Sequence, residues 1–259
     1  MKNFLKVLCI ATSFASSVFA ESKLVDSAVF LHTLRNSPKI EQNGNVLNLK
    51  QNALVKAEGL KIECNENQYA SLKFSNSVVI VVKANTTLKI SQFKQVQPFE
   101  QKHSDSREQT NSILHIELEK GSLDVISLEQ RTKSELKIDT KIGSFAFKSR
   151  EFSIEQKHDK INVFVLSGQV MFTSKTGKQD FIRSKQYASA SLENASSNYP
   201  LIIEQFGMIV EREIRNRLSP CRQINDSVKF DFDENKNLVA NRIIFKEFLL
   251  KKSKYEYRK

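Results

Sequence analysis

The chain has 259 residues, a formal net charge of +11 and a hydrophobic share of 40%. This length is enough for one large β domain, or for one domain with an appendage. Beyond residue 20, no apolar stretch reaches the roughly 20 residues that a membrane-spanning helix needs, so the sequence excludes a transmembrane segment in a mature protein that has lost its leader.

The first twenty residues have the pattern of an export signal. Lys2 and Lys6 precede the apolar segment 7–19, which leads to the small residue Ala20. This pattern predicts cleavage before Glu21 and a periplasmic or secreted protein. An uncleaved anchor is the alternative, although the segment contains several Ser and Thr and is short for a membrane span. Cleavage removes two lysines and leaves 239 residues with a formal charge of +9.

The positive charge limits the classes of partner. A basic cytoplasmic protein would suggest nucleic acid, but export removes that partner from reach. Another envelope protein with acidic groups, or an anionic envelope surface such as a cell-wall polymer, remains as a partner. The basic residues can also form an ordinary solvated surface.

Two cysteines remain after cleavage, Cys64 and Cys221. An oxidising compartment favours a disulfide between an even pair of cysteines. Such a bridge would close a long loop and stabilise the protein by about 4–5 kcal/mol in the chain-entropy model. The sequence does not show that the two residues meet, so a disulfide and two free thiols are both open.

Alternating apolar residues predict a mainly β-sheet body. Segment 69–74 alternates with period two, Ser75–Ser77 forms a turn, and segment 78–82 is an unbroken aliphatic run. Such a run predicts a strand that is covered on both faces, or an edge strand that needs protection from aggregation. Segment 87–90 alternates again.

Residues 93–112 interrupt this pattern, because polar and charged residues crowd them, and they predict an exposed loop. Strands then recur at a spacing of about 8 to 12 residues, which is typical of an all-β body. Turns are predicted at Glu119–Gly121, at Ser167–Gln169 and at Gly177. The predicted strands are 113–118, 123–126, 136–138, 144–147, 152–154, 161–166 and 170–172.

After Pro200 the apolar period becomes helical. Apolar residues recur at helical spacing at Ile202, Phe206, Ile209, Val210, Ile214 and Leu218. We expect Ser219–Pro220 to end this helix. Its residues Ile202, Phe206, Ile209 and Val210 form a candidate interaction surface, which packs on the β body or on another protein.

Two more segments follow the predicted helix. Residues 228–232 and 238–245 predict a hairpin. The basic tail, residues 242–259, contains Tyr255 and Tyr257. It is either a frayed terminus or a segment that lies against an anionic surface.

The motifs predict no enzyme, no cofactor and no metal site. Residues 231–242 have the alternate oxygen ligands of a calcium loop, but Lys236 and Arg242 stand where that loop needs glycine and glutamate. Ser134–Lys137 and Lys175–Gly177 spell two signatures of penicillin-recognising enzymes, but the third is absent and the serine enters a β segment. The four histidines have no metal-ligand spacing.

Four motifs in order resemble the FecR-type domain, the periplasmic part of iron-citrate transport regulators. They are the strand segments 69–90, the glycine turn in Leu118–Val125, the step Thr140–Gly143 and the closing hairpin Val163–Val170. The resemblance spans about residues 46–191. It implies short strands stacked into a twisted β-solenoid or sandwich, with no catalytic residues.

The chain departs from this family at two turns. Ser149–Phe152 replaces a Gly-Thr-x-Phe element, and Ser75–Ser77 replaces an Asp-Gly-Ser turn. The chain therefore resembles a divergent, stand-alone member whose turns are built without those glycines. Regulators of the family signal through an N-terminal cytoplasmic segment and a membrane span. Here an export leader opens the sequence, so we do not expect the regulatory role to carry over.

These patterns predict a signal peptide (1–20), a FecR-like β domain (21–200) and a C-terminal extension of helix and hairpin (201–259). The leading hypothesis is a non-enzymatic exported module for binding or scaffolding in the bacterial cell envelope. The alternative is a self-assembling structural or adhesin-like component that associates through edges such as 78–82. A third hypothesis is a polysaccharide-acting enzyme, which needs two carboxyl groups about 5–10 Å apart in a cleft.

Overall fold

The computed structural model describes residues 24–96, 110–127, 131–148, 151–193, 201–234 and 238–242. Strands make up 61% of it, and one C-terminal helix accompanies them within these ranges. The mainly β prediction is therefore confirmed. The predicted signal peptide, most of the predicted loop 93–112 and most of the basic tail lie outside the described residues.

The first nine strands lie between residues 24 and 96. They are β1 (Leu24–Asp26), β2 (Ala28–Arg35), β3 (Lys39–Gln42), β4 (Asn45–Val46), β5 (Ala53–Lys56), β6 (Leu60–Cys64), β7 (Tyr69–Phe74), β8 (Val79–Val82) and β9 (Thr86–Val96). Because β9 extends through Phe93 to Val96 and the next strand begins at Ser112, the predicted loop is shorter at both ends than the sequence indicated.

The second half contains the longest strand and the helix. Its elements are β10 (Ser112–Ile126), β11 (Glu135–Asp139), β12 (Gly143–Phe147), β13 (Glu151–Lys157), β14 (Lys160–Ser167), β15 (Gln169–Ser174), β16 (Gln179–Arg183), β17 (Gln186–Ser191), β18 (Ile202–Gln205), α1 (Met208–Ser227), β19 (Val228–Phe232) and β20 (Leu238–Arg242). The last two strands pair as the hairpin that the sequence predicted.

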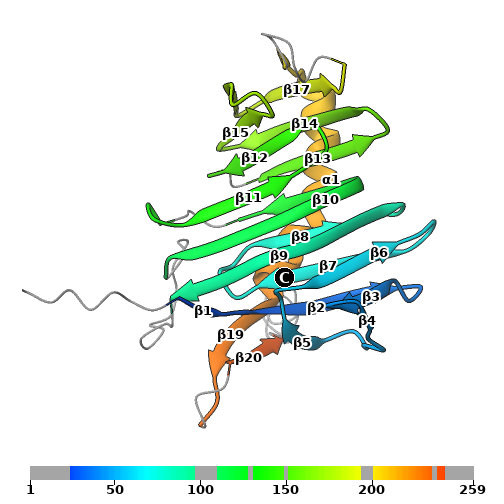
Figure 1. Ribbon diagram of the computed structural model, residues 1–259, viewed down its shortest axis with the longest axis vertical. Coiled ribbons are helices and arrows are strands. Elements are labelled where there is room, and N and C mark those ends of the chain that lie inside the picture. The colour runs from blue at the N-terminus through cyan, green and yellow to red at the C-terminus, as the bar shows by residue number, and fades with distance from the viewer. Residues whose placement is uncertain are drawn as a thin grey trace, which may run out of the picture.

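Strands β1 to β18 form two sheets that stack as layers (Figure 1), with β1 paired to the end of β9, whereas β19 and β20 form a separate hairpin. Sheet A has the order β4, β3, β6, β9, β10, β11, β12, β15, β16. Sheet B has the order β5, β2, β7, β8, β10, β13, β14, β17, β18. The chain passes between the sheets as it advances, hairpin after hairpin. This is the stacked, twisted architecture that the FecR resemblance implied.

Strand β10 belongs to both sheets and makes a corner at Gly121. Its first half pairs with β9 in sheet A, and its second half pairs with β8 and β13 in sheet B. The sequence predicted a turn at Glu119–Gly121, whereas the structure has one continuous strand that bends there. Gly121 has φ +96°, and a Cβ at this position would lie 2.4 Å from the backbone Cα of Thr86. The corner therefore requires glycine for both reasons.

The apolar faces of the two sheets meet in one core. Alternate residues of each strand point inward, so aliphatic side chains such as Ile62, Leu88 and Ile116 are fully buried between the sheets. The ring of Phe74 packs edge-on against that of Phe93, with 5.3 Å between the centroids. Burial of the inward face is the main force that holds the layers together.

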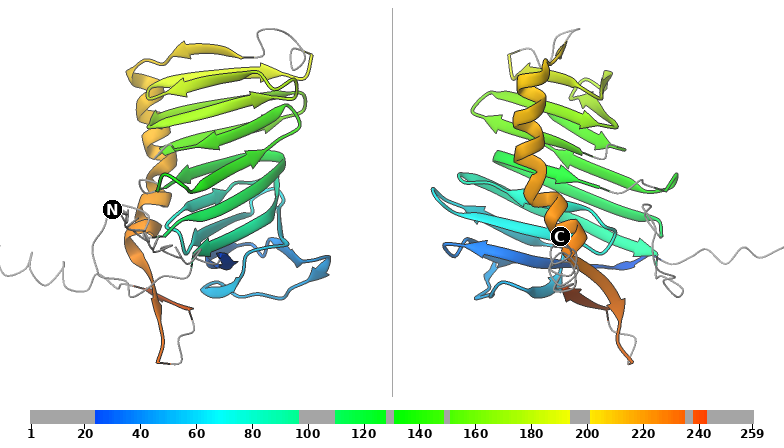
Figure 2. Two further views of the ribbon diagram at one scale, coloured as in Figure 1. Left: turned by 60° about the vertical axis from the view of Figure 1, so that its left-hand side comes forward. Right: turned by 180° about the vertical axis from the view of Figure 1, so that it is seen from behind.

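Helix α1 lies across the outer face of sheet B (Figure 2). Its residues Ile214, Leu218, Cys221 and Ile224 are buried against the outward-facing side chains of Val79, Val81, Ile126 and Leu166. Because Ile80 and Val82 point into the core between the sheets, the aliphatic run 78–82 is covered on both faces. The first of the two alternatives for this run is confirmed. Because β8 also pairs with β7 on one side and β10 on the other, it is not an edge strand available for self-assembly.

The bounds of the predicted helix were wrong at both ends. Ile202–Gln205 forms β18, which pairs with β17 at the end of sheet B. The helix begins only at Met208 and passes through Pro220 to Ser227. A proline inside a helix costs about 3 kcal/mol, and burial of Cys221 and Ile224 on sheet B offsets this cost. Within the described residues, α1 is too polar to cross a membrane, and no other helix is present.

Three basic side chains fix α1 on the sheet. The guanidinium of Arg222 donates two hydrogen bonds of 2.8 Å to the carboxylate of Glu151, and Arg217 donates one of 2.8 Å to the Ser153 hydroxyl. The Nζ of Lys73 donates to the backbone oxygens of Asn225 (2.6 Å) and Val228 (2.5 Å) at the C-terminal end of the helix. A cation at this end also interacts favourably with the helix dipole.

Lys73 is only 5% exposed. Burial lowers the pKa of Lys73 from 10.5 to about 8, although the charge of Asp226 acts in the opposite direction. The unfolded chain therefore binds the proton more tightly than the folded protein does. Above about pH 8 the folded state loses its proton first, so the cost of burying the charge disappears as the pH rises towards 10.5.

We expect Ala at position 121 to destabilise the fold more than Ala at position 177. Gly177 has φ +85°, but no atom lies within 4 Å of the place that a Cβ would take there. Gly177→Ala should therefore cost only the strain of positive φ, about 1 kcal/mol, whereas Gly121→Ala adds a clash with the backbone and should cost about 3 kcal/mol. Urea unfolding measures both changes. An equal decrease in the free energy of unfolding in the two variants would contradict the predicted clash with the Thr86 backbone.

A second prediction concerns Lys73. The stability that the wild type gains between pH 8 and 10.5 should be largely absent in Lys73→Met, because the buried amine is gone. The difference between 10.5 and about 8 corresponds to at most about 3 kcal/mol. Urea unfolding at several pH values in this window measures it, and Lys160→Met, at an exposed lysine, is the control. If the free energy of unfolding rises equally with pH in Lys73→Met and in the wild type, Lys73 is not the group responsible for the rise.

Candidate interaction site

The outer face of sheet A is charged. Neighbouring strands place Glu41 beside Lys61, Lys61 beside Lys89, and Lys89 beside Glu117. The next strand places Asp139 beside Glu117. This follows from the alternation of each strand, because the intervening residues are apolar and point into the core.

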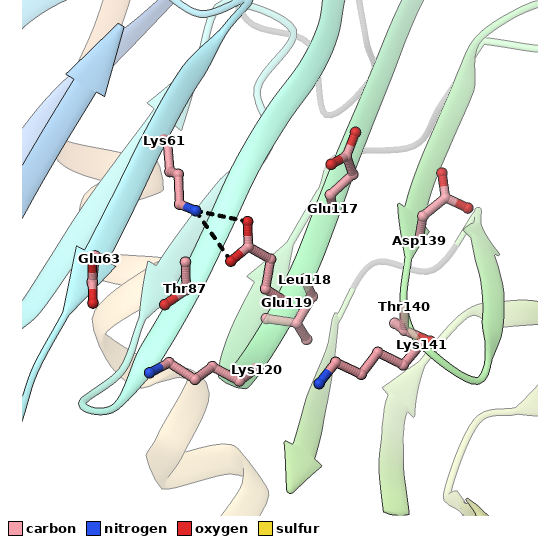
Figure 3. Close-up of a pocket in the computed structure, with 10 residues that line it drawn as sticks. All are labelled: Lys61, Glu63, Thr87, Glu117, Leu118, Glu119, Lys120, Asp139, Thr140 and Lys141. Carbon is pink, nitrogen blue, oxygen red and sulfur yellow. Dashed lines mark hydrogen bonds and ion pairs between the residues drawn. The ribbon is translucent and has the colours of Figure 1, made fainter. Parts of the chain in front are cut away.

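A hollow of about 670 Å³ lies on this face (Figure 3). Its residues come from β6, β9, β10, β11 and the turn after β11. They are Lys61, Glu63, Thr87, Glu117, Leu118, Glu119, Lys120, Asp139, Thr140 and Lys141. A volume of this size is in the range of about 300–1,000 Å³ that is typical of ligand-binding sites.

Lysines neutralise three of the carboxylates in the hollow. The Nζ of Lys61 donates hydrogen bonds of 2.8 and 3.1 Å to the two oxygens of Glu119, and this contact raises the pKa of Lys61. Glu117 lies 3.7 Å from Lys89. Asp139 forms an ion pair of 3.0 Å with Lys137 and accepts a hydrogen bond from Ser144. Each exposed pair contributes little to stability, about 0–1 kcal/mol, but together they balance the acidic charge.

Lys120 and Lys141 have no acidic partner among the described residues, and both are exposed. Figure 3 shows the two side chains along the same rim of the hollow, with their amino groups pointing the same way. The backbone of Lys120 is positioned by the corner at Gly121. Lys141 lies in a tight turn in which the Thr140 hydroxyl donates to the Gly143 carbonyl (2.7 Å) and accepts from the Gly143 amide (3.2 Å). Two neighbouring ammonium groups without an acidic partner in the described part of the chain favour binding of an acidic group.

The carboxylates of the hollow do not form an acid–base pair. A glycosidase needs two carboxyl groups that face one bond of the substrate. Here Glu117, Glu119 and Asp139 each contact a different lysine on an exposed surface. Within the described residues, no group of three or more His, Cys, Asp or Glu could hold a metal ion.

The two cysteines do not form a disulfide, which decides between the two alternatives that the sequence left open. Cys64 lies in the core between the sheets, whereas Cys221 lies between α1 and the outer face of sheet B. Both are free and buried, and sheet B separates them. Burial raises the pKa of each thiol to about 12, so neither is prepared for reaction.

The candidate interaction surface on the C-terminal segment is divided by the fold. Phe206 and Val210 pack on the cluster between α1 and sheet B. Ile202 and Ile209 remain 58% and 74% exposed, and the neighbouring Met208 is 85% exposed. Two of the four residues therefore lie on the β body and two point away from it.

Sequence reasoning did not find the hollow on sheet A. A signal was available in the alternating segments 61–63, 117–120 and 137–141, which each carry charges at every second position. Charged residues on one face of a strand are also common on any solvated sheet, so the segments by themselves do not predict a site. The pairing of lysines with carboxylates, and the two lysines left without a partner, depend on the register between strands.

Comparison with known protein families agrees with the resemblance seen in the motifs. The family model described as FecR protein matches residues 61–171. Two crystal structures of a candidate anti-sigma factor from Parabacteroides distasonis ATCC 8503 align with 71% of this chain and 99% of theirs, at 10% and 8% identity and TM-scores of 0.41 and 0.39. No curated protein sequence matches the chain. The chain thus carries a FecR-type domain, and residues 61–171 are the part that matches the family.

Proposed function

We propose that this protein is a non-enzymatic, exported binding module of the bacterial cell envelope, and that the hollow on sheet A binds an acidic group of a partner protein. The observation that carries the proposal is the pair of ammonium groups of Lys120 and Lys141, which have no acidic partner in the described part of the chain and lie beside carboxylates that have lysine partners. The FecR-type domain supports a binding or regulatory role rather than catalysis.

The export pattern of residues 1–20 supports an envelope location. A chain that is exported would meet proteins and polymers of the envelope but not nucleic acid. The formal charge of +9 after cleavage favours acidic partners in general. The net positive charge therefore attracts an acidic partner over a distance, and the hollow then makes the specific contact with it.

A protein partner fits sheet A better than a uniformly anionic surface does. The outer face carries both signs of charge, and Glu63, Glu117 and Asp139 lie among the lysines. A polymer or membrane with negative charge everywhere can bind Lys120 and Lys141 but offers no complement to the lysine–carboxylate pairs around them. A protein surface can place an acidic side chain at Lys120 and Lys141 and basic ones elsewhere.

The test uses the full chain with its leader, which carries a photo-crosslinking residue at position 63 of the hollow in living cells, so that Lys120 and Lys141 are unchanged. We expect one main adduct with an envelope protein. The double variant Lys120→Glu, Lys141→Glu, without a crosslinker, should bind the purified partner at least about tenfold more weakly than the wild type. It loses two attractive contacts and gains two repulsive ones.

The matched control is Lys160→Glu, Lys175→Glu, which makes the same charge change at two exposed lysines away from the hollow. This control should retain the partner. Equal weakening in both double variants would indicate a general charge effect and would contradict the proposal. Binding to anionic lipid vesicles that depends on Lys120 and Lys141 would instead favour the anionic envelope surface.

The self-assembling alternative has one supporting observation, the exposed apolar residues Ile202, Met208 and Ile209 beside the edge strand β18. Within the described residues, β18 pairs only with β17, and an open strand edge can pair with a second copy. This function predicts that the molar mass measured by light scattering rises with protein concentration. Ile209→Lys should abolish the rise, and Phe181→Lys, at an exposed site on sheet A, should not. A constant monomer mass would rule it out.

A further inference from the structure

A second cavity, of about 470 Å³, lies on the opposite side of the molecule from the hollow. It is a groove between the C-terminal half of α1 and strands β2, β7 and β8 of sheet B. The residues that line it are His32, Thr33, Tyr69, Ser71, Val81, Pro220, Gln223, Ile224, Asp226 and Ser227. This volume is also within the range of small-molecule sites.

The groove exists because α1 lies over an aliphatic part of sheet B and also over a polar part of it. Under the middle of the helix, sheet B presents Val79 and Val81, and the helix packs closely on them. Under its C-terminal end, β2 and β7 present His32, Tyr69 and Ser71 instead. These polar side chains give the helix no apolar surface to cover. Hydrogen bonds from Lys73 to the end of α1 hold the helix in place without filling the space.

Ser71 is the central observation. Its side chain is 1% exposed, and among the described residues its hydroxyl has no hydrogen-bond partner. A buried hydroxyl without a partner costs about 1–3 kcal/mol, and most buried polar groups in folded proteins are satisfied. Because Ser71 lines the groove, a bound molecule with a hydroxyl or amide group could supply the missing hydrogen bond.

The other lining residues define the chemistry of such a molecule. The Nδ1 of His32 lies 2.8 Å from the Thr33 hydroxyl. Gln223 and Asp226 are exposed on the helix side, and Val81 and Ile224 supply buried apolar surface. The ring of Tyr69 lies 5.9 Å from the Arg35 guanidinium, measured to the ring centroid.

The charge of the lining excludes anions as the preferred ligand. Asp226 is the carboxylate among the ten lining residues, and neither lysine nor arginine is among them. The nearby Lys73 is engaged by two backbone oxygens of the helix end. A phosphate or carboxylate group would therefore meet the negative charge of Asp226, and Arg35, which lies over the Tyr69 ring, is not among the lining residues.

We propose that this groove binds a neutral saccharide unit. A pyranose has hydroxyl groups around its edge, which match Ser71, Gln223 and Asp226, and an apolar face, which matches an aromatic ring such as Tyr69. The inference is independent of the proposed function, because the groove and the hollow lie on different sheets and share no residue.

The experiment is a titration of the isotope-labelled mature chain with neutral sugars, followed by backbone amide NMR. The probes are glucose, galactose and N-acetylglucosamine. We expect at least one of them to shift the amides of Thr33, Ser71 and Gln223 saturably, and the phosphorylated form of the same sugar to bind more weakly. If none of the neutral sugars shifts these amides, or if the sugar phosphate binds more tightly, the proposal is wrong.

Two variants localise the binding. Ser71→Met fills the groove and should weaken binding at least about tenfold. Gln223→Ala changes an exposed helix residue, so the fold should be intact even if Ser71→Met fails to fold, and it should weaken binding severalfold. Lys160→Ala is the control and should bind as the wild type does. Wild-type affinity in Gln223→Ala together with wild-type affinity in any folded Ser71→Met would overturn the assignment.

Discussion

Side chains of a β-strand point alternately to opposite faces, and this constraint governs both surfaces of the molecule. The inward residues of two sheets meet in a single core, so every second position is committed to packing. The outward residues are free to differ between the sheets. The outward residues of sheet A are charged, whereas those in the centre of sheet B are aliphatic and are covered by α1. A one-residue shift of register would exchange the two sets, which is why the corner at Gly121 matters beyond its own turn.

The helix covers sheet B unevenly, and the uneven cover has two consequences. Over the aliphatic centre the contact is close, and buried residues of α1 complete a second apolar cluster. Over the polar residues of β2 and β7 the helix leaves a groove with an unsatisfied hydroxyl at Ser71. Lys73 lies two residues after Ser71 on β7, and its hydrogen bond to Val228 holds the end of α1 above the groove.

The two candidate sites differ in their relation to the family. All residues of the hollow on sheet A lie between positions 61 and 141, within the segment 61–171 that matches the FecR family model. The groove combines β7 and β8 from that segment with β2 and α1, which lie outside it. The hollow is thus formed by the FecR-type domain itself, and the groove is formed by what this chain adds to it.

The sequence by itself determined the β character, the four motifs of the FecR-type domain and the C-terminal hairpin, because period-two alternation and turn residues are local properties. It also indicated that the run 78–82 needed cover, without saying what covers it. Only the tertiary structure decided that Ile202–Gln205 pairs as a strand, that α1 continues through Pro220, and that Cys64 and Cys221 lie on opposite sides of sheet B. The tertiary structure also decided which carboxylates lie near Lys61, Lys120 and Lys141. These outcomes depend on contacts between residues far apart in the chain, and such contacts leave no local pattern.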